Sequence, residues 1–192
     1  MPDIDLDFAN RTAILDKIKH VPAAIINDTE IRKHNTGVYC HNIPVNPFNK
    51  LASIDYRQAE DRGYFKIDFL NVNLYNQIEN NQQLLDLMNR EPQWDQLYEQ
   101  SFCEQLIHIG NHYDTLISMP EAVTSIDRMA MFLAIIRPAK RHLIGKPWDE
   151  VAKTVWIKPD DDGYYFKKSH SLAYSHLVVV NMNLLNLSDL TN

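Results

Sequence analysis

Charged and apolar residues alternate in two short segments of the chain, and this alternation predicts two strands. In the first segment the acids are Asp3, Asp5 and Asp7, and the apolar residues are Ile4, Leu6 and Phe8. The second segment, residues 63–69, carries a fourth acid, Asp68, between Ile67 and Phe69. Successive side chains of a strand point to opposite faces. We therefore expect the N-terminal acids on one face and the apolar residues between them in a core.

Helical spacing of apolar residues predicts helices over most of the remaining chain. The first would be capped by Asn10 or Thr12 and run to about His20, where Pro22 ends it. Residues 37–41 read as a strand and residues 42–49 as a loop. Further helices are expected at 72–80, 81–89, 93–110, 113–119, 126–136, 148–156 and 169–187. The predicted fold is α+β, a small sheet of acidic strands covered by helices, as a single domain over residues 1–192.

Composition limits the classes of function. The chain has 192 residues, 45% of them hydrophobic, which is enough for one globular core. A formal net charge of −6 argues against a nonspecific binder of duplex DNA, which carries a basic excess. The two cysteines, Cys40 and Cys103, form no CxxC motif and indicate neither a disulfide framework nor a zinc site. With no signal peptide or membrane span in the pattern, we expect a cytoplasmic protein without a membrane partner.

The acids suggest metal chemistry. Clustered carboxylates repel one another and favour a divalent cation with hard oxygen ligands. If the strand of Asp68 lies beside the first strand, Asp3, Asp5 and Asp68 converge as in a two-metal phosphoryl-transfer site. The alternative is that the acids lie on the exposed face of an edge strand, where they prevent edge-to-edge aggregation.

Four segments in collinear order resemble the bacterial replicative polymerases of the C family, the DNA polymerase III alpha subunit. Pro2–Phe8 resembles the PDxDxDF signature, and Arg32–Val38 resembles the KHAGG segment. Phe65–Leu70 resembles KFDFLG, and Tyr165–Tyr174 resembles FNKSHAxAY. Leu133–Pro138 is a weaker match to the LxRPGP segment. The resemblance spans nearly the whole chain and implies a nucleotidyltransferase palm in residues 1–80 and a helical, fingers-like part in residues 81–192.

The resemblance also implies roles for individual residues. Asp3, Asp5 and Asp68 correspond to the catalytic carboxylates, which would hold two Mg²⁺ or Mn²⁺ ions, whereas Asp7 would be a neighbour. Positions near the incoming nucleotide or the template are matched by Lys33, His34, Arg137, Lys168 and His170. Lys168 and Ser169 stand where a helix is expected to begin, and free N–H groups there favour anions. Alternatively, His170 caps or packs the helix, and Lys33 and Arg137 are surface charges.

The chain departs from the family in ways that leave its function open. The Gly- and Ser-rich segment before PDxDxDF and the PHP, thumb, clamp-binding and template-binding regions have no counterpart, which suggests a truncated derivative. A phage genome is one setting for such a derivative, and the bacterial cytoplasm is then its location. One hypothesis is a minimal nucleotidyl-transfer core that uses nucleotide and DNA. Another is a non-catalytic nucleotide-, nucleic-acid- or protein-binding replication accessory. A third is self-assembly or capture of a host partner.

Overall fold

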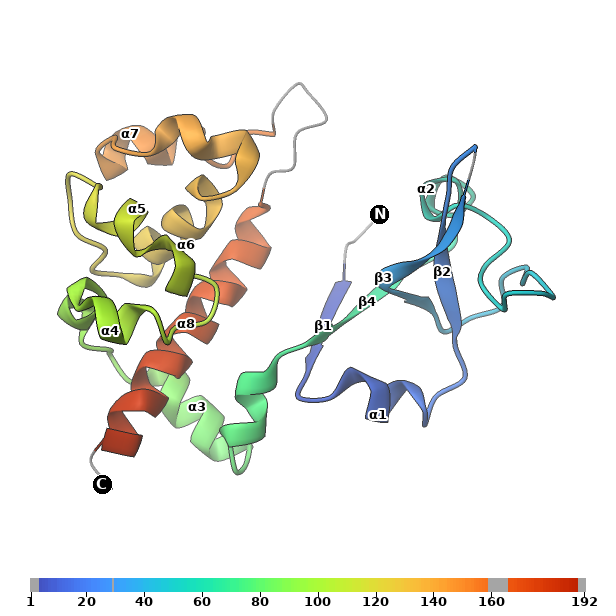
Figure 1. Ribbon diagram of the computed structural model, residues 1–192, viewed down its shortest axis with the longest axis horizontal. Coiled ribbons are helices and arrows are strands. Elements are labelled where there is room, and N and C mark those ends of the chain that lie inside the picture. The colour runs from blue at the N-terminus through green and yellow to red at the C-terminus, as the bar shows by residue number, and fades with distance from the viewer. Residues whose placement is uncertain (1–3, 29, 159–165, 190–192) are drawn as a thin grey trace. The chain divides into compact units, whose positions relative to one another are not determined.

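The computed structural model describes residues 4–28, 30–158 and 166–189. Asp3, one of the three predicted metal ligands, lies outside the described residues. The chain divides into two compact units, Met1–Glu79 and Asn80–Asn192. The first unit holds the sheet and the second is helical, so the protein is α+β (Figure 1).

The sheet of the first unit is mixed. Its strands are β1 (Ile4–Phe8), β2 (Val21–Ile26), β3 (Ile31–Tyr39) and β4 (Ile67–Asn71), in the order β1-β4-β3-β2. β1 pairs with β4 in parallel, whereas β3 is antiparallel to both β4 and β2. β1 and β4 lie side by side although the β2–β3 hairpin and a long segment after it separate them in the chain. The pairing of β1 with β4 brings the two acidic segments together.

Short helices and loops complete the first unit. Helix α1 (Arg11–Leu15) begins at Asn10, whose side chain accepts a hydrogen bond from the Ala13 backbone N–H. Leu15 of α1 packs against Val38 of β3 and Phe69 of β4 in a small apolar cluster. Helix α2 (Tyr56–Asp61) is capped by Asp55, and a 3₁₀ helix, η1 (Asn73–Gln77), follows β4. A second small core is formed by Ala23, Tyr39, Ile43, Ala52 and Ala59.

The expectation that the apolar residues of β1 all enter a core is wrong. Ile4 and Leu6 are 38% and 39% exposed. Phe8 is half-buried and stacks on Phe69, with ring centroids 5.2 Å apart. The reason is that α1 is short, with only five residues. The apolar cluster formed with Leu15 of α1 includes Phe8, but it does not include Ile4 or Leu6.

The second unit is built around its last helix. Its elements are α3 (Asn81–Asn89), η2 (Trp94–Tyr98), α4 (Gln100–Cys103), η3 (Gly110–His112), α5 (Tyr113–Ile117), α6 (Ile126–Ile135), η4 (Pro138–Leu143), α7 (Trp148–Thr154) and α8 (Lys168–Asp189). α8 packs against α6 and α3 (Figure 1). Val178, Val179 and Met182 of α8 share one core with Met129, Phe132 and Leu133 of α6. None of the helices in the described part is long and apolar enough to cross a membrane.

Several predicted elements differ from the observed ones. The first helix ends at Leu15 rather than near His20, and the strand β2 that follows was not predicted. The strand expected at 37–41 is the longer β3, and the helix expected at 72–80 is the 3₁₀ helix η1. The single helix expected at 93–110 is instead a 3₁₀ helix and a short α-helix, η2 and α4. α3 has the predicted bounds.

Candidate functional site

Asp5 and Asp68 are direct neighbours in the sheet. Asp5 of β1 is the register partner of Asp68 of β4, and partners on adjacent strands share a face. The strands of a sheet lie about 4.8 Å apart, so the two carboxylates project from neighbouring positions. Asp5 is half-buried and Asp68 is only 8% exposed. The structure thus brings together two of the three predicted acids.

Asp68 is held by Thr36 of β3 and by Lys66, which immediately precedes β4. The Thr36 hydroxyl donates a hydrogen bond to Asp68 Oδ1 at 2.5 Å, and the Lys66 ammonium forms an ion pair with Oδ2. Lys66 immediately precedes β4, two residues before Asp68, and its side chain lies on the same face as the Asp68 carboxylate. The side chains of this pair are only 19% and 11% exposed. Lys66 thus supplies a largely buried counter-charge for Asp68.

His34 lies beside this pair as a neutral imidazole. Its Nδ1 accepts hydrogen bonds from the backbone N–H groups of Gly37 at 2.9 Å and Thr36 at 3.3 Å. An Nδ1 that accepts these bonds carries no proton, so its 3.8 Å approach to Asp68 Oδ1 is not an ion pair. Burial, and then the charge of Lys66, lowers the pKa of His34, in agreement with this tautomer. The proton is therefore on Nε2, which can act as a donor.

Gly37 leaves the space that Lys66 uses. Gly37 pairs with Asp68 across β3 and β4. A Cβ at position 37 would lie 2.6 Å from Lys66 Cδ and 3.0 Å from His34 Nδ1. Such contacts are far inside van der Waals distance, so a larger residue would displace the Lys66 side chain. Glycine is required here for close packing.

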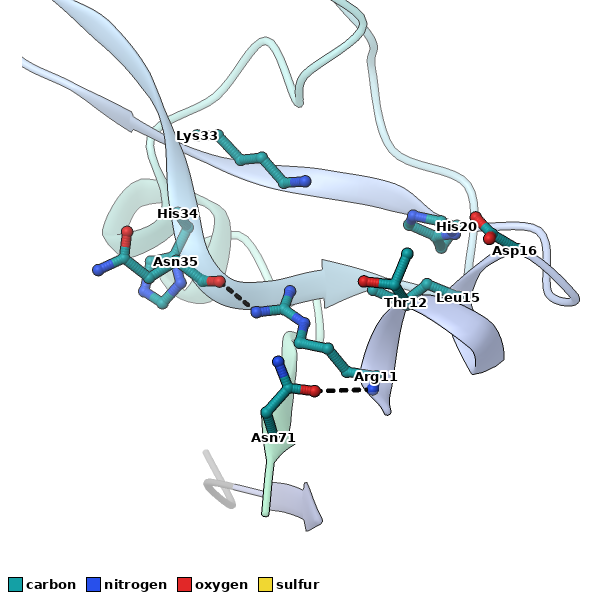
Figure 2. Close-up of a pocket in the computed structure, with 9 residues that line it drawn as sticks. All are labelled: Arg11, Thr12, Leu15, Asp16, His20, Lys33, His34, Asn35 and Asn71. Carbon is teal, nitrogen blue, oxygen red and sulfur yellow. Dashed lines mark hydrogen bonds between the residues drawn. The ribbon is translucent and has the colours of Figure 1, made fainter. Parts of the chain in front are cut away.

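A pocket of about 470 Å³ opens next to this acidic site (Figure 2). His34 is part of the acidic site and also lines the pocket. Arg11, at the start of α1, enters the pocket with its guanidinium bound to the backbone carbonyl of Asn35 and, at 3.4 Å, to that of Thr36. The Arg11 backbone N–H donates to Asn71 Oδ1 at 2.8 Å. Arg11 therefore ties α1 to β3 and β4 at the pocket.

The other predicted site residues, Arg137, Lys168, Ser169 and His170, belong to the second unit. Arg137 precedes η4, and its guanidinium lies over the Phe166 ring at 5.0 Å from the centroid. His170 contacts the same ring edge-on, with centroids 6.2 Å apart. Arg137 and His170 are thus brought together around Phe166. Lys168 lies 6.0 Å from the centroid of Trp156, and Ser169 is exposed.

His108, which sequence reasoning did not single out, belongs to the same cluster in the second unit. Its ring contacts Tyr174 edge-on at 4.4 Å, and Tyr174 stacks on Phe166 at 5.3 Å. Burial, followed by the charge of Arg137, lowers the pKa of His108 to about 4. His108 Nε2 and Arg137 Nε are both buried and have no hydrogen-bond partner among the residues that the structure describes. The cluster therefore keeps a neutral histidine beside a partly desolvated arginine.

The acidic site fits a divalent cation in part. Asp5 and Asp68 provide hard oxygen ligands on adjacent strands, which suits Mg²⁺ or Mn²⁺. The residues that the structure describes contain no group of three or more His, Cys, Asp or Glu side chains arranged to hold a metal ion. Asp3, the expected third ligand, lies outside them. The two described carboxylates can thus contribute to a cation site, and the Lys66 ammonium is the positive charge that a cation at Asp68 would replace.

Three residues of the first unit were missed by sequence reasoning. Thr36 and Lys66 hold Asp68, and Arg11 shapes the pocket. Lys66 had a sequence signal, because residues two apart on a strand point the same way. Thr36 and Arg11 had none, because each reaches the site through contacts with residues far away in the chain.

Comparisons of this chain with protein-family models, with curated proteins and with solved structures found no match. The resemblance to the polymerase family accordingly rests on the sequence motifs. The arrangement within the first unit is the basis on which a function can be proposed.

Proposed function

We propose that the protein is a minimal nucleotidyl-transfer core similar to the palm of the DNA polymerase III alpha subunit, acting on nucleotide and DNA. The observation that supports this most is the register of Asp5 with Asp68 on adjacent parallel strands, next to a pocket lined by basic residues. Paired carboxylates with a phosphate-binding surface beside them are the parts that phosphoryl transfer requires.

In this proposal each residue of the acidic site has a role. Asp5 and Asp68, with Asp3, would hold Mg²⁺ or Mn²⁺, and the metal would supply charge neutralisation at the transferring phosphate. Thr36 fixes the orientation of Asp68 through its hydroxyl hydrogen bond. His34, kept neutral by two backbone N–H groups, offers its Nε2 proton as a hydrogen-bond donor. Phosphoryl transfer depends on such positioning and electrostatics rather than on covalent chemistry by the protein.

A second candidate function is a non-catalytic nucleotide-, nucleic-acid- or protein-binding accessory of replication, derived from the same palm. The ion pair between Lys66 and Asp68 favours it, because the protein itself neutralises the carboxylate. In that case nucleotide would bind without a requirement for a divalent cation, and the partners would be other replication proteins.

The test is a thermal-unfolding titration with Mg²⁺ and Mn²⁺ on the wild type and on Asp5→Asn. At 10 mM metal the wild-type Tm should rise, because a ligand that binds only the folded state stabilises it by about 1.4 kcal/mol at ten times its Kd. For a unit of this size that corresponds to a rise of roughly 8 °C. Asp5→Asn should lose most of the rise, whereas Asp61→Asn, at the exposed end of α2, should retain it. Equal rises in all three proteins would remove the basis for the metal site.

Templated primer extension separates the two functions. Extension that depends on Asp5 and on metal supports the nucleotidyl-transfer core. Metal-independent binding of nucleotide with no extension, alone or with replication partners, supports the accessory.

A further inference from the structure

The permanent charges in the pocket beside the acidic site are mostly positive. Arg11 and Lys33 line it against a single acid, Asp16, and His20 and the neutral His34 add two imidazole rings. Figure 2 shows Lys33 reaching in from β3 and Arg11 from the start of α1, on different sides of the same space. This concentration of basic groups contrasts with the net charge of −6 for the whole chain. A local positive field in an acidic protein points to an anionic ligand.

The two permanent cations of the pocket have no acidic partner in the part of the chain that the structure describes. The Arg11 guanidinium is bound only to backbone carbonyls, which fix its position without neutralising its charge. The Lys33 ammonium makes neither a hydrogen bond nor an ion pair within the described residues. One cation is therefore pre-positioned, and the other is available to bind a ligand.

We propose that Arg11 and Lys33 bind a phosphate group of a polyphosphate ligand in this pocket. The inference rests on the proposed function in that it names the part of the first unit that holds the phosphates of a nucleotide. It assigns this role to Arg11, which none of the matched segments contains. The planar Arg11 fork suits two phosphate oxygens at once, and Lys33 adds a mobile point charge.

Neighbouring groups favour phosphate over a simple carboxylate or a cation. Thr12 and Asn71 line the pocket and provide hydroxyl and amide groups for further oxygens. Several donors around one cavity match a ligand with many acceptor oxygens. A pocket of about 470 Å³ is within the range of small-molecule sites.

The experiment is isothermal titration of the full chain with inorganic tripolyphosphate at low ionic strength, with EDTA present so that no divalent metal contributes. Wild type should bind tripolyphosphate. Lys33→Gln should weaken binding about 10-fold, the effect of losing one charge-assisted hydrogen bond. Arg11→Gln should weaken it at least as much, and Asp16→Asn should strengthen it. The matched control is Arg32→Gln, because Arg32 is the exposed neighbour of Lys33 on β3 and points to the opposite face.

The source of the phosphate is tested by repeating the titration with a deoxynucleoside triphosphate and with the nucleoside alone. Binding of both triphosphates but not of the nucleoside supports the proposal. The proposal would be overturned if the wild type bound neither triphosphate. It would also be overturned if Lys33→Gln and Arg32→Gln weakened triphosphate binding equally. The Lys33 ammonium makes no hydrogen bond or ion pair in the described residues, so its variant is informative even if Arg11→Gln does not fold. Because this titration contains no divalent metal, it tests the phosphate pocket alone. A failure of the cation site would appear only in the thermal-unfolding titration with Mg²⁺ and Mn²⁺.

Discussion

Replacing Lys66 by Met tests whether the ion pair with Asp68 holds the sheet together at the candidate site. Met keeps an unbranched apolar stem beside Gly37 but removes the ammonium. Asp68, which is 8% exposed, would then keep the Thr36 hydroxyl and lose its positive partner. A buried carboxylate without a counter-charge is strongly unfavourable.

The expected cost is about 3 kcal/mol, the lower end of the values for breaking a buried ion pair, because both side chains retain some exposure. Replacing the acid as well, in Lys66→Met with Asp68→Asn, removes the unpaired charge. The double variant should therefore be more stable than the sum of the single effects predicts, with a coupling free energy of about 2 kcal/mol.

Hydrogen–deuterium exchange with mass spectrometry measures this locally. The three tryptophans, Trp94, Trp148 and Trp156, all lie in the second unit, so tryptophan fluorescence does not report on the sheet. Peptides from β3 and β4 should exchange roughly 100-fold faster in Lys66→Met, with α6 peptides as an internal reference. If the two single changes are additive in the double variant, the ion pair contributes no stability and the reasoning fails.

Two further predictions concern steric fit and pH. Gly37→Ala should destabilise the first unit by about 2 kcal/mol, because its Cβ would lie 2.6 Å from Lys66 Cδ. This loss of stability should be smaller in a Lys66→Ala background. An equal loss in both backgrounds would exclude the contact with Lys66 as its cause. The pKa of His108 is lowered to about 4, so the unfolded chain takes up a proton first as the pH falls, and the second unit should lose about 2 kcal/mol between pH 7 and pH 5. Denaturation followed by tryptophan fluorescence measures this loss. The variant His108→Asn should remove most of it, and asparagine tolerates the backbone φ of 67° at this position. An unchanged pH profile in this variant would show that His108 is not the group responsible.

The acidic strands were predictable because alternation is a local signal: β1 lies within the first predicted segment, and β4 begins within the second, 63–69, and continues to Asn71. The strand β2 was missed because Pro22 reads as the end of a helix. In the structure Pro22 lies on an edge strand, beside an irregularity in the pairing with β3. A proline is tolerated at such a position, where a backbone donor is not needed. Helix α5 lies within the predicted range 113–119, whereas the helical range 93–110 is divided into η2 and α4, because buried apolar residues there do not follow one helical period.

The surroundings of the acids could be predicted only in part. Lys66 lies two residues before Asp68 in the predicted strand 63–69, so its face follows from the sequence. His34, Thr36 and Gly37 reach Asp68 through the antiparallel pairing of β3 with β4, whose register depends on contacts far apart in the chain. No local pattern fixes such a register. Likewise, the position of Arg11 depends on carbonyl groups of β3 that lie 24 and 25 residues away.

The register of β1 with β4 explains why Lys66 is needed. Two full charges about 5 Å apart repel each other by about 3 kcal/mol at the effective dielectric constant of a partly buried protein site. Asp5 and Asp68 are neighbours at this spacing, so the parallel pairing that aligns them as cation ligands also creates a cost for folding. The Lys66 ammonium offsets that cost at Asp68, and Gly37 provides the room for its side chain. A cation that binds there must therefore compete with a counter-charge that the protein already supplies.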